Sequence, residues 1–233
     1  MTSCEQVADG VWAVTGRAVS WAILAEGGAV TLVDAGYPGD LDAVLASLAG
    51  TGHRLEDVAA VLVTHAHVDH VGALPGLLAR HDVPVLAGAE ELPMLRGDRR
   101  ESAGPLDVVR RAWQPRWAVW GLRAARLGAT RHVTVPSAVA LDPAGPLDVP
   151  GRPVAVPTPG HTSGHTAFHV PGAGVLVTGD ALVTGHPTSA RTGPQLLDAV
   201  FHHDQAAAQR AFDLLAAFPA DVVLPGHGSA VRV

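Results

Sequence analysis

Short apolar segments separated by glycine-containing turns dominate the first third of the chain. Segments rich in Val and Ile predict three strands, over residues 11–15, 20–25 and 30–33. Apolar side chains at a spacing of three and four then predict a helix over residues 39–48. The run 58–63 is apolar at every position, which is typical of a strand buried on both faces. A helix over 71–81 and a strand over 83–86 are expected next.

The stretch from Ala89 to Thr130 has a different pattern, because it is rich in Arg, Leu and Trp and poor in β-branched runs. Apolar side chains recur at spacings of three and four from Leu106 to Leu127, which predicts one long apolar helical face. Pro115 interrupts this pattern and should break or bend the helix. We interpret residues 89–130 as a helical insertion.

The second half of the chain returns to strands. They are expected over residues 131–135, 153–158, 166–170, 174–178 and 221–224. Asp204 is a candidate N-cap for a helix that continues to about Ala217. Each half therefore consists of strands followed by a helix. This arrangement predicts an α/β fold in which two sheets pack between helical layers, formed by residues 1–233 as a single domain.

Composition narrows the classes of function. The net charge is -6 and no run of basic residues is present, which argues against a nucleic-acid partner. The apolar runs are all shorter than the roughly 18–20 residues that cross a membrane, and no secretory signal begins the chain. The single cysteine, Cys4 near the expected frayed terminus, cannot form a disulfide framework. We expect a cytoplasmic protein with a small-molecule substrate and no membrane partner.

The clearest chemical signal is the segment His65-Ala66-His67-Val68-Asp69-His70, which begins directly after the buried strand 58–63. Four side chains of the kinds that bind metals lie within six residues, on what we expect to be a loop. They can reach a common point if that loop curls around it. Imidazole and carboxylate ligands suit zinc, and also iron, manganese or cobalt.

Three more candidate ligands have the same placement. His161, Asp180 and His227 each follow a glycine at the end of a predicted strand, where backbone can approach a site closely. One such residue alone is usually a cap or a turn residue. Seven of them at four strand ends predict a metal centre, formed by His65, His67, Asp69, His70, His161, Asp180 and His227.

These motifs resemble those of the metallo-β-lactamase superfamily, and among its members most closely those of glyoxalase II-like and lactonase-like enzymes. The matching segments are 64–70, Thr-Pro-Gly-His-Thr-Ser-Gly-His at 158–165, Thr-Gly-Asp at 178–180 and Pro-Gly-His-Gly at 225–228. The resemblance implies a four-layer αβ/βα sandwich with two metal ions, expected to be zinc although iron or manganese is possible, at one edge. It implies one metal held by His65, His67 and His161, a second held by Asp69, His70 and His227, and a bridge formed by Asp180. It also implies that Asp34 orders metal-bound histidines, whereas His165 has a structural or supporting role.

The implied activity is hydrolysis of a small ester, thioester, lactone or amide. Two metal ions would share a bridging water and generate hydroxide near neutral pH. Asp69 would orient that hydroxide and pass its proton to the leaving group. Other readings stay open: a phosphodiesterase or nuclease with the same site, a mononuclear iron sulfur dioxygenase or a diiron protein, and a binding protein with a decayed site.

Several departures narrow the substrate. Asp180 stands where true metallo-β-lactamases typically have Cys or Ser, so antibiotic hydrolysis is not expected. Glyoxalase II enzymes carry a C-terminal helical region that helps bind glutathione thioesters. Only six residues follow His227 here, so specificity for glutathione thioesters is not expected. Lactonases use a tyrosine near the metals. The only tyrosine here is Tyr37, so a lactonase activity stays open without support from a motif.

The role of the tryptophans in the insertion has two interpretations. Trp113, Trp117 and Trp120 share the predicted apolar face beside Pro115. They could form a wall or lid of a substrate pocket over the metals. The interpretation we favour is that they pack the core of the insertion or form a contact in a homodimer.

Overall fold

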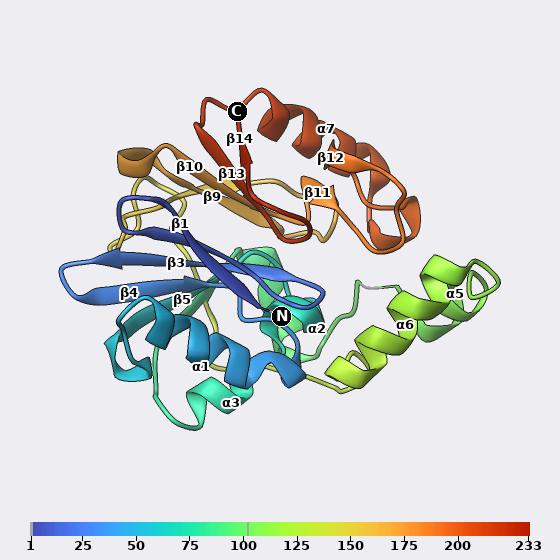
Figure 1. The fold of residues 1–233 in the computed structure, drawn as a ribbon, viewed down its shortest axis with the longest axis horizontal. Coiled ribbons are helices and arrows are strands. Elements are labelled where there is room, and N and C mark those ends of the chain that lie inside the picture. The colour runs from blue at the N-terminus through green and yellow to red at the C-terminus, as the bar shows by residue number, and fades with distance from the viewer. Residues whose placement is uncertain (1, 102) are drawn as a thin grey trace.

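Two β-sheets face each other in the centre of the protein, and helices cover their outer faces (Figure 1). The computed structural model describes residues 2–101 and 103–233. The larger sheet has seven strands in chain order: β1 (Ser3–Ala8), β2 (Val11–Thr15), β3 (Ser20–Glu26), β4 (Ala29–Val33), β5 (Val58–Val63), β6 (Val85–Ala87) and β7 (Val139–Ala140). Neighbouring strands from β1 to β4 are antiparallel, and those from β4 to β7 are parallel.

The second sheet has five strands in the order β14 (Val231–Arg232), β13 (Val222–Pro225), β10 (Val175–Gly179), β9 (Thr166–Val170) and β8 (Val154–Pro157). Strands β11 (Val183–Gly185) and β12 (Thr192–Gln195) form a separate pair. The helices are α1 (Leu41–Gly50), α2 (Val68–Val71), α3 (Leu74–Leu78), α4 (Leu92–Arg96), α5 (Pro105–Val109), α6 (Pro115–Leu127) and α7 (Gln205–Ala216).

Alternation of side chains along the strands builds the layers. On β3, Trp21 and Ile23 belong to the apolar cluster beneath α1 and α3, whereas Ala22 and Leu24 face the second sheet. Phe168 of β9 meets them from that sheet and is fully buried. Side chains of α7 cover the outer face of the second sheet. The layers are therefore helix, sheet, sheet and helix, which confirms the αβ/βα sandwich expected from the motifs.

Some predicted elements differ in detail. The segment 131–135 is not a strand; Val135 is buried and its amide donates to the Leu95 carbonyl oxygen, and Pro136 follows it. The helix predicted over 71–81 is divided into α2 and α3, because Pro75 has no N–H to continue the first helix. The N-terminal residues, expected to be frayed, form β1, in which Cys4 is exposed.

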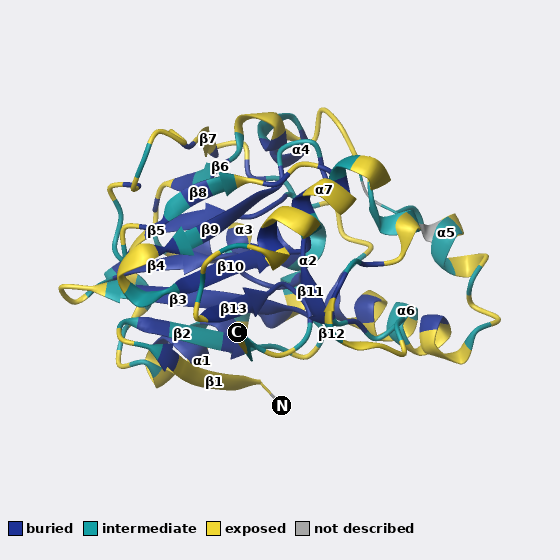
Figure 2. Ribbon diagram, turned by 90° about the horizontal axis from the view of Figure 1, so that it is seen from above, coloured by how far each residue is buried: buried dark blue, intermediate teal, exposed yellow. Residues whose placement is uncertain are grey.

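The insertion is less uniform than its sequence pattern suggested. Helices α5 and α6 extend away from the two sheets (Figure 1), and much of the surface of α6 is exposed (Figure 2). Trp117 and Leu127 are buried, but Leu106 and Trp113 are exposed, Trp113 to 80%. The break expected at Pro115 is confirmed, because α6 begins there, but the apolar side chains from Leu106 to Leu127 do not share one buried face. None of the described helices is long and apolar enough to span a membrane.

Candidate metal centre

The seven candidate ligands converge at one end of the two sheets. His65 follows β5, and Asp69 and His70 lie on the short helix α2 rather than on a loop. His161 lies in the loop between β8 and β9, Asp180 follows β10, and His227 follows β13. Because β5, β10 and β13 deliver these residues from their carboxyl ends, both sheets contribute to the same site.

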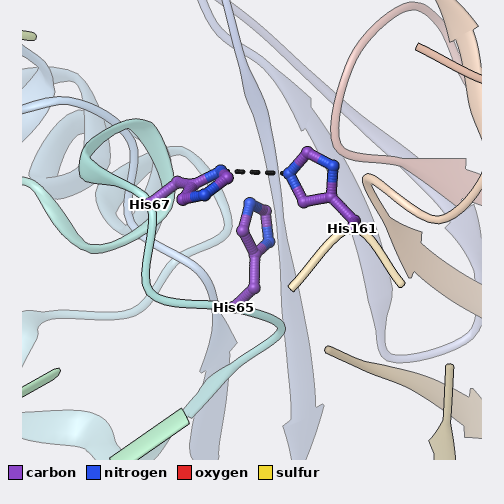
Figure 3. Close-up of side chains that lie close together, drawn as sticks. All are labelled: His65, His67 and His161. Carbon is purple, nitrogen blue, oxygen red and sulfur yellow. Dashed lines mark hydrogen bonds between the residues drawn. The ribbon is translucent and has the colours of Figure 1, made fainter. Parts of the chain in front are cut away.

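One cluster consists of His65, His67 and His161, whose ligand-type nitrogens all lie within 4.8 Å of one another. The three rings face a common point, with His65 below the other two (Figure 3). His67 Nδ1 and His161 Nε2 are 3.0 Å apart. Three imidazole nitrogens at this spacing can share one metal ion.

A second cluster consists of Asp69, His70 and His227, within the same limit of 4.8 Å. Asp180 lies between the clusters. Its Oδ2 is 3.3 Å from His227 Nε2 and 3.5 Å from His161 Nε2, and its Oδ1 is 3.4 Å from His70 Nε2. Asp180 is thus the carboxylate that can contact a cation in either cluster.

The outward nitrogen of each of the five histidines has a hydrogen-bond acceptor. His67 Nε2 donates to the Glu101 carbonyl at 2.7 Å. His70 Nδ1 donates to Asp34 Oδ2, and His227 Nδ1 to the Ala18 carbonyl, both at 2.8 Å. Thr64 Oγ1 gives its own proton to Asp34, so it accepts from His65 Nδ1 at 3.1 Å. His202 donates its Nε2–H to the Leu197 carbonyl, so its Nδ1 accepts from His161 at 3.4 Å.

These partners fix the tautomers. In the neutral form, every one of the five rings turns a lone pair, not an N–H, toward the centre. Of the buried side-chain polar atoms without a hydrogen-bond partner in the described chain, three of four lie here: His65 Nε2, His70 Nε2 and Asp180 Oδ1. An unpaired buried polar group costs about 1–3 kcal/mol. Convergent lone pairs and unpaired oxygens fit a divalent cation.

The electrostatics of the centre also favour positive charge. Burial and neighbouring histidines hold the pKa of His65 well below its ordinary value. Burial lowers the pKa of His227 as well, but Asp180 and Asp69 outweigh it and raise that pKa to about 10. Conversely, burial raises the pKa of Asp69, whereas His70 and His227 lower it to about 2. Burial also raises the pKa of Asp180, but His227 and His70 outweigh it and hold that pKa well below its ordinary value. Asp69 and Asp180 are therefore both ionised at neutral pH.

The sequence profile of the metallo-beta-lactamase superfamily matches residues 14–227. The chain belongs to this superfamily. It is 28% identical over 215 residues to the probable metallo-hydrolase YflN of Bacillus subtilis (strain 168), covering 84% of this chain and 74% of YflN. It is 32% identical over 159 residues to a hydroxyacylglutathione hydrolase of Fuscovulum blasticum, covering 68% of this chain and 45% of that protein.

Solved structures of the superfamily share the fold. A metallo-beta-lactamase from Cronobacter sakazakii has a TM-score of 0.68 at 18% identity, over 97% of this chain and 81% of that chain. A metallo-beta-lactamase family protein from Thermus thermophilus has a TM-score of 0.65 at 25% identity, over 97% of this chain and 76% of that chain. The superfamily expected from the motifs is confirmed, and as one of its members the chain is a metal-dependent hydrolase.

Asp34 and His165 lie behind the candidate ligands and contact two of them. Asp34 has a φ of 62°, and its carboxylate accepts from Thr64 N (2.8 Å), Thr64 Oγ1 (2.7 Å) and His70 Nδ1 (2.8 Å). His165 Nε2 accepts from the Asp180 amide at 3.1 Å, so its Nδ1 donates to Thr158 Oγ1 at 2.8 Å. Asp34 therefore orients His70, and His165 holds the backbone of Asp180.

Glu91 is a site residue that the sequence reasoning missed. It is fully buried, and its carboxylate accepts from the Ala66 amide (2.8 Å), the Gly164 amide (3.1 Å) and the Thr162 hydroxyl. These partners lie in the two loops that carry His65, His67 and His161. Burial raises the pKa of Glu91 to about 7, although the three hydrogen bonds lower it. Adjacent Glu90 is exposed, so no local signal in the sequence distinguishes the two.

Glu101 was missed as well. Its carbonyl accepts from His67, and its carboxylate accepts from the amide of Ser163 at 2.7 Å and from the Ser163 hydroxyl. Arg99 Nε lies 3.1 Å from the same carboxylate. The start of the insertion is thereby attached to both loops of the first cluster.

The three tryptophans do not form one group. Trp117 stacks on Phe201 with 5.3 Å between ring centroids, and Trp120 meets both rings edge-on. Trp120 also contacts His186, whose ring lies 4.9 Å from that of His227. Trp117 and Trp120 thus connect to the metal centre through His186, whereas Trp113 is exposed and lies outside this group.

Proposed function

We propose that the chain is a dinuclear zinc hydrolase of small esters, thioesters, lactones or amides. The observation that carries the proposal is the pair of clusters that share Asp180, with five histidine lone pairs turned inward. His65, His67 and His161 would hold one ion, Asp69, His70 and His227 the other, and Asp180 both. Imidazole and carboxylate donors favour zinc, and they also accept iron or manganese.

The residues of the site divide the remaining work. When bound, the two ions supply Lewis acidity and lower the pKa of water enough to give a nucleophile near neutral pH. The side chain of Asp69 is 16% exposed and that of Asp180 is 3% exposed, so Asp69 is the carboxylate that can reach substrate. Its low pKa leaves it ionised. Asp69 would accept a proton from water and pass it to the leaving group.

An acyl substrate is favoured over a nucleic acid by the surroundings of the centre. Trp120, Phe201 and His186 form an apolar and aromatic wall next to His227. Such a wall suits the acyl or aromatic part of a small molecule. The similarity to a hydroxyacylglutathione hydrolase also favours acyl transfer to water.

Pairing with a second copy of the chain would cover the exposed side of the insertion. Large apolar side chains are exposed there, at Leu106, Val109, Trp113, Val119 and Leu122. Residues 104–131 contain six Arg and one Asp, whereas the rest of the chain contains ten Arg and 21 acidic residues. Apolar exposure and opposite charge favour a homodimer. Sedimentation equilibrium should give a dimer that Trp113→Glu converts to monomer; a monomeric wild type would refute the pairing.

The decisive experiment combines elemental analysis of purified protein with a hydrolysis screen of lactones, thioesters, esters, amides, β-lactams and phosphodiesters. We expect about two zinc ions per chain and turnover that a chelator abolishes. His65→Ala should lose metal and activity, whereas His169→Ala, on the outer side of β9 against Phe218, should retain both. One iron per chain without hydrolysis would favour a dioxygenase, and turnover of phosphodiesters alone would favour a nuclease; either result would overturn the proposal.

A further inference from the structure

His186 lies beside the candidate metal centre but belongs to neither cluster of candidate ligands. It follows β11 directly, and its ring is perpendicular to that of His227, with 4.9 Å between centroids. Trp120 and Phe201 pack against its other sides, at 5.5 Å and 5.4 Å. The residue is only 8% exposed, so its orientation is set by packing. Its ring therefore lies between Trp120 and Phe201 on one side and His227 on the other.

The hydrogen bonds of His186 determine which ring nitrogen carries the proton. The Thr188 amide lies 3.3 Å from Nδ1, and an amide N–H can only donate, so Nδ1 accepts. The Thr188 hydroxyl lies 2.7 Å from the same nitrogen. The neutral ring consequently has its proton on Nε2. The five candidate ligand rings each have a lone pair on the nitrogen that faces the centre, whereas His186 has an N–H on its second nitrogen.

Nε2–H of His186 is a donor without an acceptor in the described part of the chain. No hydrogen bond joins it to a described residue, and it is not among the fully buried unpaired atoms, so it keeps contact with solvent. The charged groups around it are Asp69 and Asp180, with His227 between them and the ring. A neutral N–H donor at the margin of this centre can meet an oxygen of a bound molecule.

We infer that His186 contacts substrate directly, donating Nε2–H to the carbonyl oxygen, or to the oxyanion it becomes, of an acyl group that lies against Trp120 and Phe201. This inference rests on the proposed acyl-hydrolase function. A donor fixed in advance by packing and by Thr188 requires no reorganisation during the reaction. It would select substrates that present a hydrogen-bond-accepting oxygen beside an apolar group.

Three substitutions separate the donor from the shape of the ring. His186→Phe keeps the ring and removes both nitrogens. His186→Gln keeps an N–H near the position of Nε2, and His186→Asn keeps polar atoms only near Nδ1. His169→Phe, made far from the centre, is the matched control.

Hydrolysis of 4-nitrophenyl butyrate by the zinc-loaded enzymes tests the role. Loss of one such donor reduces kcat by about 10²–10³-fold in other hydrolases. We expect a loss of that order for His186→Phe with two zinc ions retained, partial recovery for His186→Gln and none for His186→Asn. Activity of His186→Phe within threefold of wild type would overturn the inference. The inference would also be overturned if His186→Phe bound zinc more weakly but kept wild-type activity per bound zinc ion.

A second readout does not depend on turnover. Long-range 1H–15N spectra of the zinc-loaded protein should show His186 as the Nε2–H tautomer, and butyrate should shift its Nε2 resonance. An Nδ1–H tautomer, or no shift with butyrate at saturation, would overturn the inference. Wild-type protein that binds zinc yet hydrolyses no acyl probe would instead refute the proposed function, so the two failures are distinguishable.

Discussion

Replacing Asp34 by Asn changes the two hydrogen bonds that Oδ2 accepts, one of which comes from His70, a candidate metal ligand. Asp34 Oδ1 accepts from the Thr64 amide, which can only donate, so the amide oxygen of Asn must take that position. The Asn NH2 group then faces Thr64 Oγ1 and His70 Nδ1, where Asp34 Oδ2 now accepts. His70 Nδ1 must become an acceptor, and the ring proton moves to Nε2. That nitrogen lies 3.4 Å from Asp180 Oδ1 and loses the lone pair needed to bind metal.

The expected cost is that of losing a partner behind a metal ligand, about 10–100-fold in metal affinity. This corresponds to about 1.4–2.8 kcal/mol. The backbone should be undisturbed, because Asn tolerates the φ of 62° as Asp does. Asp34→Asn should therefore lower the affinity for metal more than it lowers the free energy of unfolding of the chelator-treated protein.

Competition with a chromophoric zinc chelator measures both affinities of Asp34→Asn. Asp204→Asn is the matched control, since Asp204 caps α7 by accepting from Ala207 N and Asn caps equally well. We expect one zinc of Asp34→Asn to weaken and the control to equal wild type. Wild-type affinity for both ions in Asp34→Asn would refute the tautomer argument.

Three further predictions concern the centre and the core. A Cβ on Gly226 would overlap Asp180 Oδ1, so Gly226→Ala should lose at least one metal by elemental analysis; retention of both would contradict this. The folded pKa of Glu91 is about 7 against an ordinary 4.5, so its protonated form contributes about 3 kcal/mol of stability that is lost as pH rises from below 4.5 to above 7. Chemical denaturation of the chelator-treated proteins at several pH values should show wild type losing about 3 kcal/mol relative to Glu91→Gln over this range, and parallel pH profiles would exclude this contribution of Glu91. Phe168→Ala should cost about 3–5 kcal/mol in the same assay, because the ring is fully buried between the sheets; a loss below about 1 kcal/mol would argue against that packing.

The strands of both sheets were the most predictable part of the fold. The apolar run 58–63 is β5, and Asp204 caps α7 as expected, because burial pattern and capping are local properties of the sequence. The segment 131–135 failed because Val135 is buried as part of a turn, without strand pairing. The insertion was predicted only in part. The break at Pro115 was expected, but which apolar side chains turn inward depends on how the two helices pack, and Leu106 and Trp113 are exposed.

The candidate ligands could be named from sequence because four of them lie in one short segment directly after a buried strand and the other three follow a glycine at a strand end. The order of residues reveals both positions. The supporting partners of these ligands could not be named in this way. Glu91 and Glu101 have no special neighbours in sequence, whereas His186 follows Gly185 at the end of β11, a signal that was not used. Each of the three acquires its role from groups between 2 and 73 positions away. Whether a carboxylate is buried, or which imidazole nitrogen carries its proton, depends on those distant partners. The sequence alone determined the chemistry available at the centre, and only the packing of two sheets decided how that chemistry is oriented.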